Sequence, residues 1–372
     1  MNAPITFDFV GAVLLTAVAA TWLERRASDF HLIDRPQGRK RHAEPTPVIG
    51  GLAMTAGIIG VHLPPASPDP ALTGFVLAAG IVVVAGVLDD MHDVQWWWRI
   101  SAQMLAALVM IHVGGVQVEQ IGRVFDRAPT SLGALSVPVT IVATVGVINA
   151  MNMADGSDGL AGSLAFAAVC MIIAAALYVG NESLAWGLVP VLGAILVFLW
   201  FNMRTPWRSR AAVFMGNAGS SLLGFTIVWA TFRLTQHEAH VLTPVLAPWF
   251  LAPPIIDCLT LIVRRIKAGK SPFHADRGHM HHLLQDAGFT PIGIVLLLTS
   301  TSFALGLTAA VLVRSDVPDH YLVVAFIALT LAYYWLTSRR QRSRRAFAAL
   351  HAWLCSIDGR PVKPAPARME EF

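Results

Sequence analysis

Residues 135–179 read LSVPVTIVATVGVINAM-NMADGSDG-LAGSLAFAAVCMIIAAALYV, which is two long apolar runs joined by a short polar segment. Each run is close to the roughly 17–25 residues that cross a bilayer as an α-helix. Polar side chains at the ends of membrane helices are costly unless they have a task. The stretch therefore predicts two membrane-spanning helices with a functional junction between them.

The composition of the whole chain places it in the same class. Hydrophobic residues make up 55% of the 372 residues, charged residues make up 13%, and the mean hydropathy is +0.60. A soluble domain carries about 25% charged residues, so we expect an all-α polytopic membrane protein with eleven transmembrane helices. The expected helices are Ile5–Leu23, Val48–Leu63, Leu72–Leu88, Ile100–Val113, Leu135–Met151, Leu160–Val179, Leu184–Phe201, Gly219–Phe232, Val241–Ile266, Ile292–Val313 and Tyr321–Leu336.

The basic residues predict the orientation of these helices. With the N-terminus outside, all Lys and Arg side chains except Arg123, Arg127, Arg233 and Arg314 fall on the inner side, where basic residues are enriched. We therefore expect an outer N-terminus and a cytoplasmic C-terminus. Residues 1–338 form the predicted transmembrane domain, and residues 339–372 form a basic cytoplasmic tail beside the lipid. The net charge of +4 then reflects loops near anionic lipid head groups, so a nucleic-acid partner is not expected.

A pair of carboxylates ends the third expected helix. Asp89 and Asp90 are adjacent and point about 100° apart on a helix, so they need not serve the same partner. One can act as a base while the other holds a cation or a basic side chain, and Arg99 follows closely. Two solvated carboxylates at a helix end are the alternative interpretation.

The junction quoted above carries two amides and two further carboxylates. Asn149 and Asn152 lie on one helix face. Asp155-Gly and Asp158-Gly favour a turn whose backbone can approach a ligand. Oxygen atoms of these types are what Mg²⁺ accepts. A polar loop in which Asp158 caps the next helix is the alternative.

A glycine-rich segment opens the eighth expected helix with Phe214-Met-Gly-Asn217-Ala-Gly. Unpaired N–H groups at a helix start favour an anion, and Phe214 can stack on a base. A simple glycine-rich helix start explains the same residues.

Histidines gather in the inner loop between Arg264 and Pro291. This loop contains His274-Ala-Asp-Arg277-Gly-His279-Met-His281-His282, and the spacing matches no closed zinc site. Histidine and arginine donors suit phosphate oxygens better. The first inner loop adds the basic residues Arg39, Lys40 and His42, for which a plain positive-inside loop is the alternative.

Five motifs in this order resemble the polyprenyl-phosphate N-acetylhexosamine-1-phosphate transferases, and most closely the WecA type. They are Asp34-Arg-Pro with Arg39-Lys40-Arg41-His42, Leu88-Asp89-Asp90, Asn149 to Leu160, Phe214 to Ser220, and Pro272 to His282. The resemblance runs from about residue 32 to residue 289. The form Asp-Arg-x-His-x-His-His favours this branch over the branch that makes peptidoglycan precursors.

The resemblance implies a reaction, a location and a set of roles. Undecaprenyl phosphate would attack the β-phosphate of UDP-N-acetylglucosamine and release UMP, as the first step of a lipid-linked surface glycan. The site would face the cytoplasm from a bacterial inner membrane, with Mg²⁺ or Mn²⁺ as cofactor and a homodimer as the usual assembly. The implied catalytic residues are Asp89, Asp90, Asp155, Asp158 and His279, the substrate-binding residues are Arg39, Lys40, His42, Arg99, Asn149, Phe214, Arg277, His281 and His282, and the metal ligands are Asn152 and Asn217.

One position departs from the family pattern. The family has Met-Gly-Asp where this chain has Met215-Gly216-Asn217, and that aspartate is a metal ligand in the family. A neutral amide should bind Mg²⁺ more weakly than a carboxylate, so we expect impaired turnover. An engineered knock-out, a pseudoenzyme and a tolerated variant are all compatible with this sequence.

Two rival interpretations come from other functional classes. Four prolines interrupt the expected helix Val241–Ile266, as in transporters. A transporter should carry ionisable residues at the middle of its spans, however, and chiefly His112 and Asp257 lie inside them. Another UDP-N-acetylhexosamine as donor is the nearer alternative, and a purely structural scaffold gains support only from Asn217.

Overall fold

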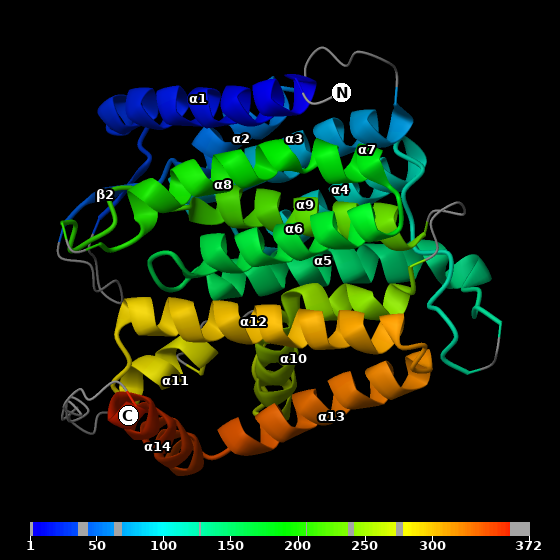
Figure 1. Cartoon of the computed structure of the whole chain (residues 1–372). Helices are drawn as coiled ribbons and strands as arrows, with labels where there is room; N and C mark the ends of the chain where they lie inside the picture. The colour runs from blue at the N-terminus through cyan, green and yellow to red at the C-terminus, as the bar shows by residue number, and fades with distance from the viewer. Residues whose placement is uncertain are drawn as a thin grey trace.

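The computed structural model describes residues 3–35, 44–62, 69–125, 128–205, 207–236, 242–272 and 278–357. This part of the chain is a bundle of helices, most of which run along one common direction (Figure 1). Two short strands, β1 (Ile33–Asp34) and β2 (Thr46–Pro47), pair antiparallel with Ile33 opposite Pro47. The predicted all-α membrane fold is confirmed. Its helices are α1 (Ala3–Arg26), α2 (Gly50–Gly60), α3 (Pro70–His92), α4 (Trp96–His112), η1 (Gly133–Leu135), α5 (Ser136–Ala154), α6 (Leu160–Tyr178), α7 (Glu182–Gly187), α8 (Val189–Asn202), α9 (Gly216–Thr235), η2 (Pro244–Leu251), α10 (Ala252–Lys267), α11 (Met280–Asp286), α12 (Pro291–Arg314), α13 (Asp319–Thr337) and α14 (Arg340–Ile357).

Each of the eleven predicted ranges coincides with a helix or with two consecutive helices. Within the described residues, eight helical segments are long and apolar enough to cross a membrane. The predicted spans that fall outside these eight correspond to α2, α4 and α9. The helix α2 has 11 residues and α4 has 17, while α9 opens with a polar Gly-Asn-Ala-Gly-Ser-Ser run. The count of eleven spans and the orientation of the termini stay predictions.

Local sequence signals set the helix boundaries. The Asp69 carboxylate accepts from the Ala71 N–H at 2.9 Å and Pro70 opens α3, while Thr290 caps α12 in the same way before Pro291. Prolines also divide the range predicted as one helix, Val241–Ile266. It folds as the 3₁₀-helix η2, with Pro248 inside it, followed by α10.

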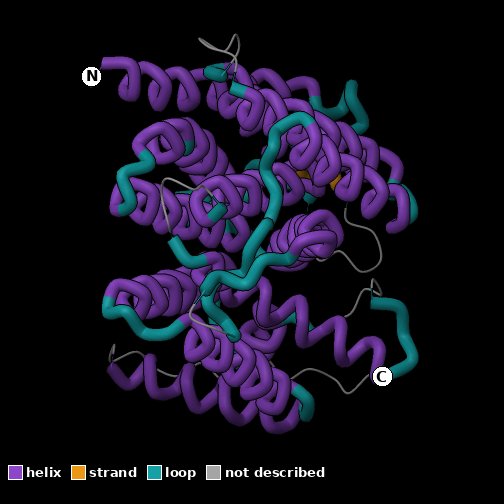
Figure 2. Tube along the Cα trace, turned by 90° about the vertical axis from the view of Figure 1, so that its right-hand side faces the viewer, coloured by secondary structure: helices purple, strands orange, loops and turns teal. Residues whose placement is uncertain are grey.

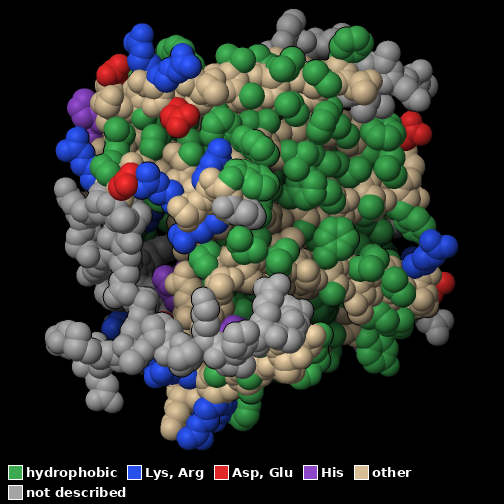
Figure 3. Space-filling view, turned by 60° about the vertical axis from the view of Figure 1, so that its left-hand side comes forward, with side chains coloured by type: hydrophobic (Ala, Val, Ile, Leu, Met, Phe, Trp, Pro, Cys, Tyr) green, Lys and Arg blue, Asp and Glu red, His purple; other side chains and the backbone are tan. Residues whose placement is uncertain are grey.

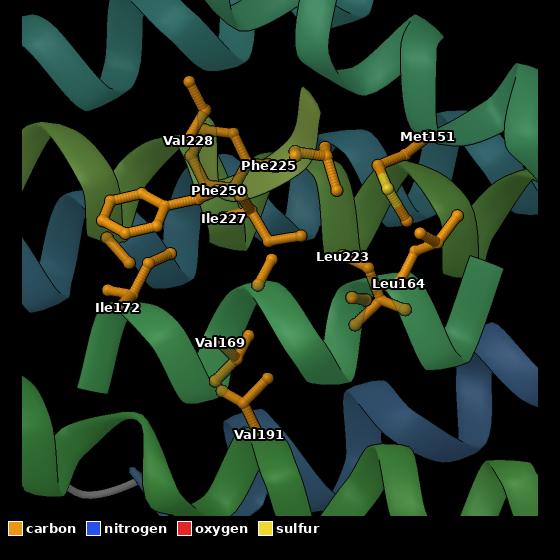
Figure 4. Packing of buried hydrophobic residues seen from close by; sticks show 14 of the residues in the cluster. Met151, Leu164, Val169, Ile172, Val191, Leu223, Phe225, Ile227, Val228 and Phe250 are labelled. Atoms are coloured by element: carbon orange, nitrogen blue, oxygen red, sulfur yellow. The ribbon is translucent and has the colours of Figure 1, made fainter. Parts of the chain in front are cut away.

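The helix α9 lies at the centre of the bundle, and nearly all of its residues beyond Asn217 are buried. Figure 4 shows Phe225, Ile227 and Val228 of α9 packed with Ile172 of α6 and Phe250 of η2. At the periphery, α13 instead exposes large apolar side chains, among them Val324, Ile327 and Leu331. Because such side chains avoid water, the outer surface of the bundle is suited to lipid.

The polar junctions gather at one end of the bundle, on the left in Figure 1, where β2, α11 and α14 lie. In Figure 3 this end comes forward and shows Lys, Arg and His side chains, whereas apolar side chains cover much of the rest of the view. Figure 2 looks onto the opposite end, which loops cross. The tail expected from residue 339 includes a helix, α14, which packs on α11 and α13. The domain boundary at 338/339 stays a prediction.

Candidate active site

Close packing of α3 against α9 sets the frame of the site. A Cβ atom on Gly86 of α3 would lie 2.4 Å from the Cα atom of Ala218, so only glycine allows this approach. The backbone of Gly216 turns into α9 with a φ angle of +74°, and a Cβ atom there would meet the Asp90 carboxylate at 2.5 Å. These two glycines bring the first turn of α9 directly onto the end of α3.

Asp90, Asn217 and Asn152 form a chain of hydrogen bonds at this contact. The Asp90 Oδ1 atom accepts from the Asn217 backbone N–H at 2.8 Å and from the Asn217 Nδ2 atom at 3.0 Å. Its Oδ2 atom accepts from the Ala218 N–H at 3.2 Å. The Asn152 Nδ2 atom of α5 donates to Asn217 Oδ1 at 2.6 Å and to Ser220 Oγ at 3.1 Å. Asp90 therefore holds the N-terminus of α9, where the helix dipole favours negative charge.

Asp89 points to a different partner, as the adjacent helical positions predict. Its Oδ2 atom accepts from Arg99 Nη1 of α4 at 3.0 Å. Its Oδ1 atom is buried and has no hydrogen-bond partner among the described residues. The Arg99 side chain remains about one-third exposed, so it can also contact an anion.

A small polar cavity lies between α3, α4, α5 and α9. Its volume is about 10 Å³, which is near the minimum for one water molecule. Asn149 and Asn152 both line it, which confirms that they share one helix face, and Asn149 Nδ2 donates to Gln103 Oε1 at 2.7 Å. The lining residues are Val82, Ala85, Gly86, Arg99, Gln103, Asn149, Asn152, Asn217 and Ser221.

The backbone of Phe214 is fixed by the segment that enters α2. The Phe214 N–H donates to the Pro47 carbonyl at 2.8 Å, and the Gly50 N–H donates to the Phe214 carbonyl at 3.0 Å. These bonds hold the Phe214 backbone beside the segment that leads from β2 into α2. Arg39, Lys40 and His42 of the first inner loop, and Arg277 of the histidine loop, lie outside the described residues.

Asp155 and Asp158 lie in the α5–α6 junction but have different surroundings. Burial of its carboxyl group raises the pKa of Asp155 to about 7, and the negative charges of Asp90 and Asp158 add to this effect. Asp158 instead forms an ion pair with Arg204, in which Nε and Oδ2 lie 2.6 Å apart. The Asp155 carboxyl group can therefore exchange a proton near neutral pH.

The histidines converge on the same junction from α11. A Cβ atom on Gly156 would lie 2.1 Å from His281 Nε2, so the ring is packed directly against this glycine. The ring centroids of His281 and His282 are 4.2 Å apart, and those of His279 and His281 are 5.6 Å apart. The predicted histidine cluster thus contacts the Asp155–Asp158 junction.

Asp257 of α10 anchors this histidine segment, which the sequence interpretation did not anticipate. Its Oδ1 atom accepts from the Met280 N–H at 3.1 Å and from the Tyr333 hydroxyl at 2.8 Å. Its Oδ2 atom lies 3.3 Å from His279 Nδ1. Asp257 stood out in the sequence as one of the few ionisable residues inside a span. The residues that it would contact were not evident from the chain alone.

The donor set can be compared with what a divalent cation requires. Among the described residues, no three His, Cys, Asp or Glu side chains gather in a way that would hold a metal ion. The Asp90 carboxylate already accepts three N–H groups, and Asn217 adds a neutral amide rather than a second carboxylate. As it stands, this site does not fit a tightly held divalent cation.

Comparison with known proteins identifies the family. The model of glycosyl transferase family 4 matches residues 72–235. The chain is 33% identical over 354 residues to undecaprenyl-phosphate alpha-N-acetylglucosaminyl 1-phosphate transferase of Escherichia coli (strain K12), which covers 92% of this chain and 93% of that protein. The chain belongs to glycosyl transferase family 4. Two proteins of the same description are each 32% identical to this chain. The match to the Yersinia pestis protein covers 90% of this chain and 92% of that protein, and the match to the Haemophilus influenzae protein covers 80% of this chain and 83% of that protein.

Membership in glycosyl transferase family 4 decides between the classes that the sequence left open. The protein is a glycosyl-1-phosphate transferase and a multi-pass protein of the bacterial inner membrane, so the transporter interpretation is set aside. Dependence on a divalent metal is general in this family. The amide at position 217 therefore stands out at the site.

Proposed function

We propose that this chain is built to transfer N-acetylglucosamine 1-phosphate from UDP-N-acetylglucosamine to undecaprenyl phosphate, with release of UMP. A phosphate oxygen of the lipid attacks the β-phosphorus of the donor, and the bond between this phosphorus and the oxygen that bridges to the α-phosphate breaks. The observation that carries the proposal is that Asn217 bonds both Asp90 and Asn152 beside a polar cavity, and that Arg99 lines both this cavity and an apolar groove. The products would serve lipid-linked surface glycan synthesis.

The acceptor lies in the groove between α3 and α4. This groove has a volume of about 700 Å³, and apolar side chains such as Leu77, Ile81 and Val84 line it. Arg99 lines both this groove and the small polar cavity. A polyprenyl chain would therefore lie among apolar side chains while Arg99 binds its phosphate, with Asp89 orienting the guanidinium through their 3.0 Å contact.

The donor lies across the remaining junctions. Phe214 stacks on the uracil base. The anion expected at the start of α9 is the Asp90 carboxylate, which already accepts from the Asn217 and Ala218 N–H groups, so the diphosphate is bound by the other junctions. His279, His281 and His282 donate to the sugar diphosphate, together with Arg277, Arg39, Lys40 and His42. Asp155 has a pKa of about 7 and can take up a proton as the bonds change, while Asp158 fixes Arg204 beside it.

Asn217 impairs this chemistry. Mg²⁺, or Mn²⁺ in its place, would supply positive charge to the diphosphate when bound, a contribution of several kcal/mol in metal-assisted reactions. Here the Asn217 amide donates a hydrogen bond to Asp90. A carboxylate at position 217 would instead offer a negatively charged oxygen to the cation. We therefore expect a slow enzyme whose other motifs remain in place.

The donor assignment is tested with the Asn217→Asp variant in detergent, supplied with undecaprenyl phosphate and Mg²⁺. Formation of lipid-linked sugar is measured with UDP-N-acetylglucosamine and with UDP-N-acetylgalactosamine. The proposal expects a kcat/KM at least about tenfold higher for the first donor, which corresponds to about 1.4 kcal/mol. Equal use of both donors, or preference for the second, would remove N-acetylglucosamine from the proposal while leaving the transferase.

A further inference from the structure

The helix α14 has two different faces. Its inner face packs Phe347, Leu350 and Leu354 against the rest of the protein and buries Ser343. Its outer face exposes Arg344 and Arg345, with the exposed aromatic side chain of Trp353 at the flank. Residues 338–357 contain five arginines and no Asp or Glu. Basic side chains of this kind next to a membrane helix are attracted to the surface of an anionic membrane.

The inner side of α14 also holds the segment that carries the histidines. Arg340 Nη2 lies 3.7 Å from the Oδ2 atom of Asp286, the last residue of α11. Just beyond that helix, the Phe289 ring packs against the His351 ring with their centroids 4.8 Å apart. Arg340 and His351 lie three turns apart along α14, so the two contacts attach α11 and the turn that follows it to α14 at two separate points.

We propose that α14 binds anionic phospholipid head groups through Arg344 and Arg345 and thereby holds α11 in place. The helix directly follows the membrane-spanning candidate α13 and lies at the same end of the bundle as α11 (Figure 1). The exposed positive charges of Arg344 and Arg345 are attracted to anionic lipid, and a flanking tryptophan is suited to the head-group region. Anionic lipid in the adjoining leaflet therefore orders α14, and through it the histidine segment. The consequence for donor binding rests on the proposed function, whereas lipid binding itself does not.

The test uses the full chain in lipid nanodiscs of phosphatidylcholine, with or without phosphatidylglycerol. Amide hydrogen exchange is measured over α11 and α14 in the parent, in Arg344→Gln/Arg345→Gln, and in the control Arg25→Gln/Arg26→Gln. The control removes the same charge from α1, away from α14. We expect phosphatidylglycerol to slow exchange in both helices by about threefold or more in the parent and the control, and to have no effect in the α14 variant.

Equal exchange in the two lipid mixtures, or equal slowing in the α14 variant, would overturn the proposal. Slowing confined to α14 would overturn its coupling to α11. UDP-N-acetylglucosamine affinity, measured in the same nanodiscs, separates the proposal from the proposed function. Exchange in α11 could depend on phosphatidylglycerol and on Arg344 and Arg345 while the affinity for UDP-N-acetylglucosamine stays the same. In that case, lipid binding by α14 and its coupling to α11 are supported, and the assigned role of α11 in donor binding is wrong.

Discussion

The amide of Asn217 donates to the Asp90 carboxylate at 3.0 Å, in a site where the family resemblance leads us to expect a second carboxylate. Two carboxylates at this distance would repel each other, and such a pair needs a proton or a cation between them. The asparagine replaces that requirement with a neutral hydrogen bond. The hydrogen bond between Asn217 and Asp90 therefore stabilises the α3–α9 junction without a cation, and for the same reason it weakens the junction as a metal site.

Gly86 should be essential for this junction. In Gly86→Ala the new methyl group would meet the backbone of Ala218, which cannot move without displacing α9. We expect a loss of about 1–3 kcal/mol, seen as a lower melting temperature in detergent. Gly80→Ala is the matched control, because a Cβ atom at Gly80 meets no atom within 4 Å. Equal melting temperatures for the two variants would contradict the packing described.

Asp155 should make stability depend on pH. Its pKa is about 7 in the folded chain and 3.8 in the unfolded reference, so its contribution is fully present below pH 3.8 and is lost as pH rises toward 7. Asp155→Asn removes this loss and should melt higher than the parent at pH 8, with the difference shrinking toward pH 5. The shift limits the loss in the free energy of unfolding to about 4 kcal/mol. Solvent screening at this partly exposed residue makes the actual loss smaller. Melting curves recorded in EDTA from pH 5 to pH 8 would contradict this account if the difference did not vary with pH.

Asp257 should act on donor binding through the histidine segment. Asp257→Ala removes the acceptor for Met280 and Tyr333, and we expect the Kd for UDP-N-acetylglucosamine to rise about tenfold in the Asn217→Asp background. Asp257→Asn retains an oxygen acceptor and should stay within about threefold of that background. Calorimetric titration measures both variants. An alanine variant that binds like the asparagine variant would show that Asp257 does not position the histidines.

The apolar groove should determine acceptor binding. Gly80 lines it, and a Cβ atom added there would meet no atom within 4 Å, so Gly80→Trp fills the groove without disturbing the core. In the Asn217→Asp background, the KM for undecaprenyl phosphate should rise about tenfold while the KM for the donor changes little. Gly146→Trp places the same side chain in open space on α5, outside the groove. If both variants raise the acceptor KM equally, the groove is not the acceptor site.

Much of the fold could be predicted from the sequence, because membrane helices have a strong local signal. Apolar length alone located a helix in each of the eleven ranges. The proline-rich range was less predictable, because Pro244 and Pro248 favour a 3₁₀ start that hydropathy does not reveal. The helix α14 was missed for a related reason, since an amphipathic helix with many arginines has low mean hydropathy.

The site was predictable in its residue types and less so in its contacts. The three-residue spacing of Asn149 and Asn152 was enough to place both on one cavity. The separation of Asp89 from Asp90 followed from their helical angle, but their partners Arg99 and Asn217 depend on how α4 and α9 pack. Asp257 also depends on tertiary packing, because Tyr333 lies 76 residues away in the chain.

The impairment by Asn217 is measured most directly by UMP release from UDP-N-acetylglucosamine and undecaprenyl phosphate, with Mg²⁺ or EDTA, for the parent and for Asn217→Asp. We expect Mg²⁺-dependent release that is about a hundredfold faster in the variant, the equivalent of about 2.7 kcal/mol. Equal rates in the two proteins would contradict the claim that Asn217 impairs this transferase.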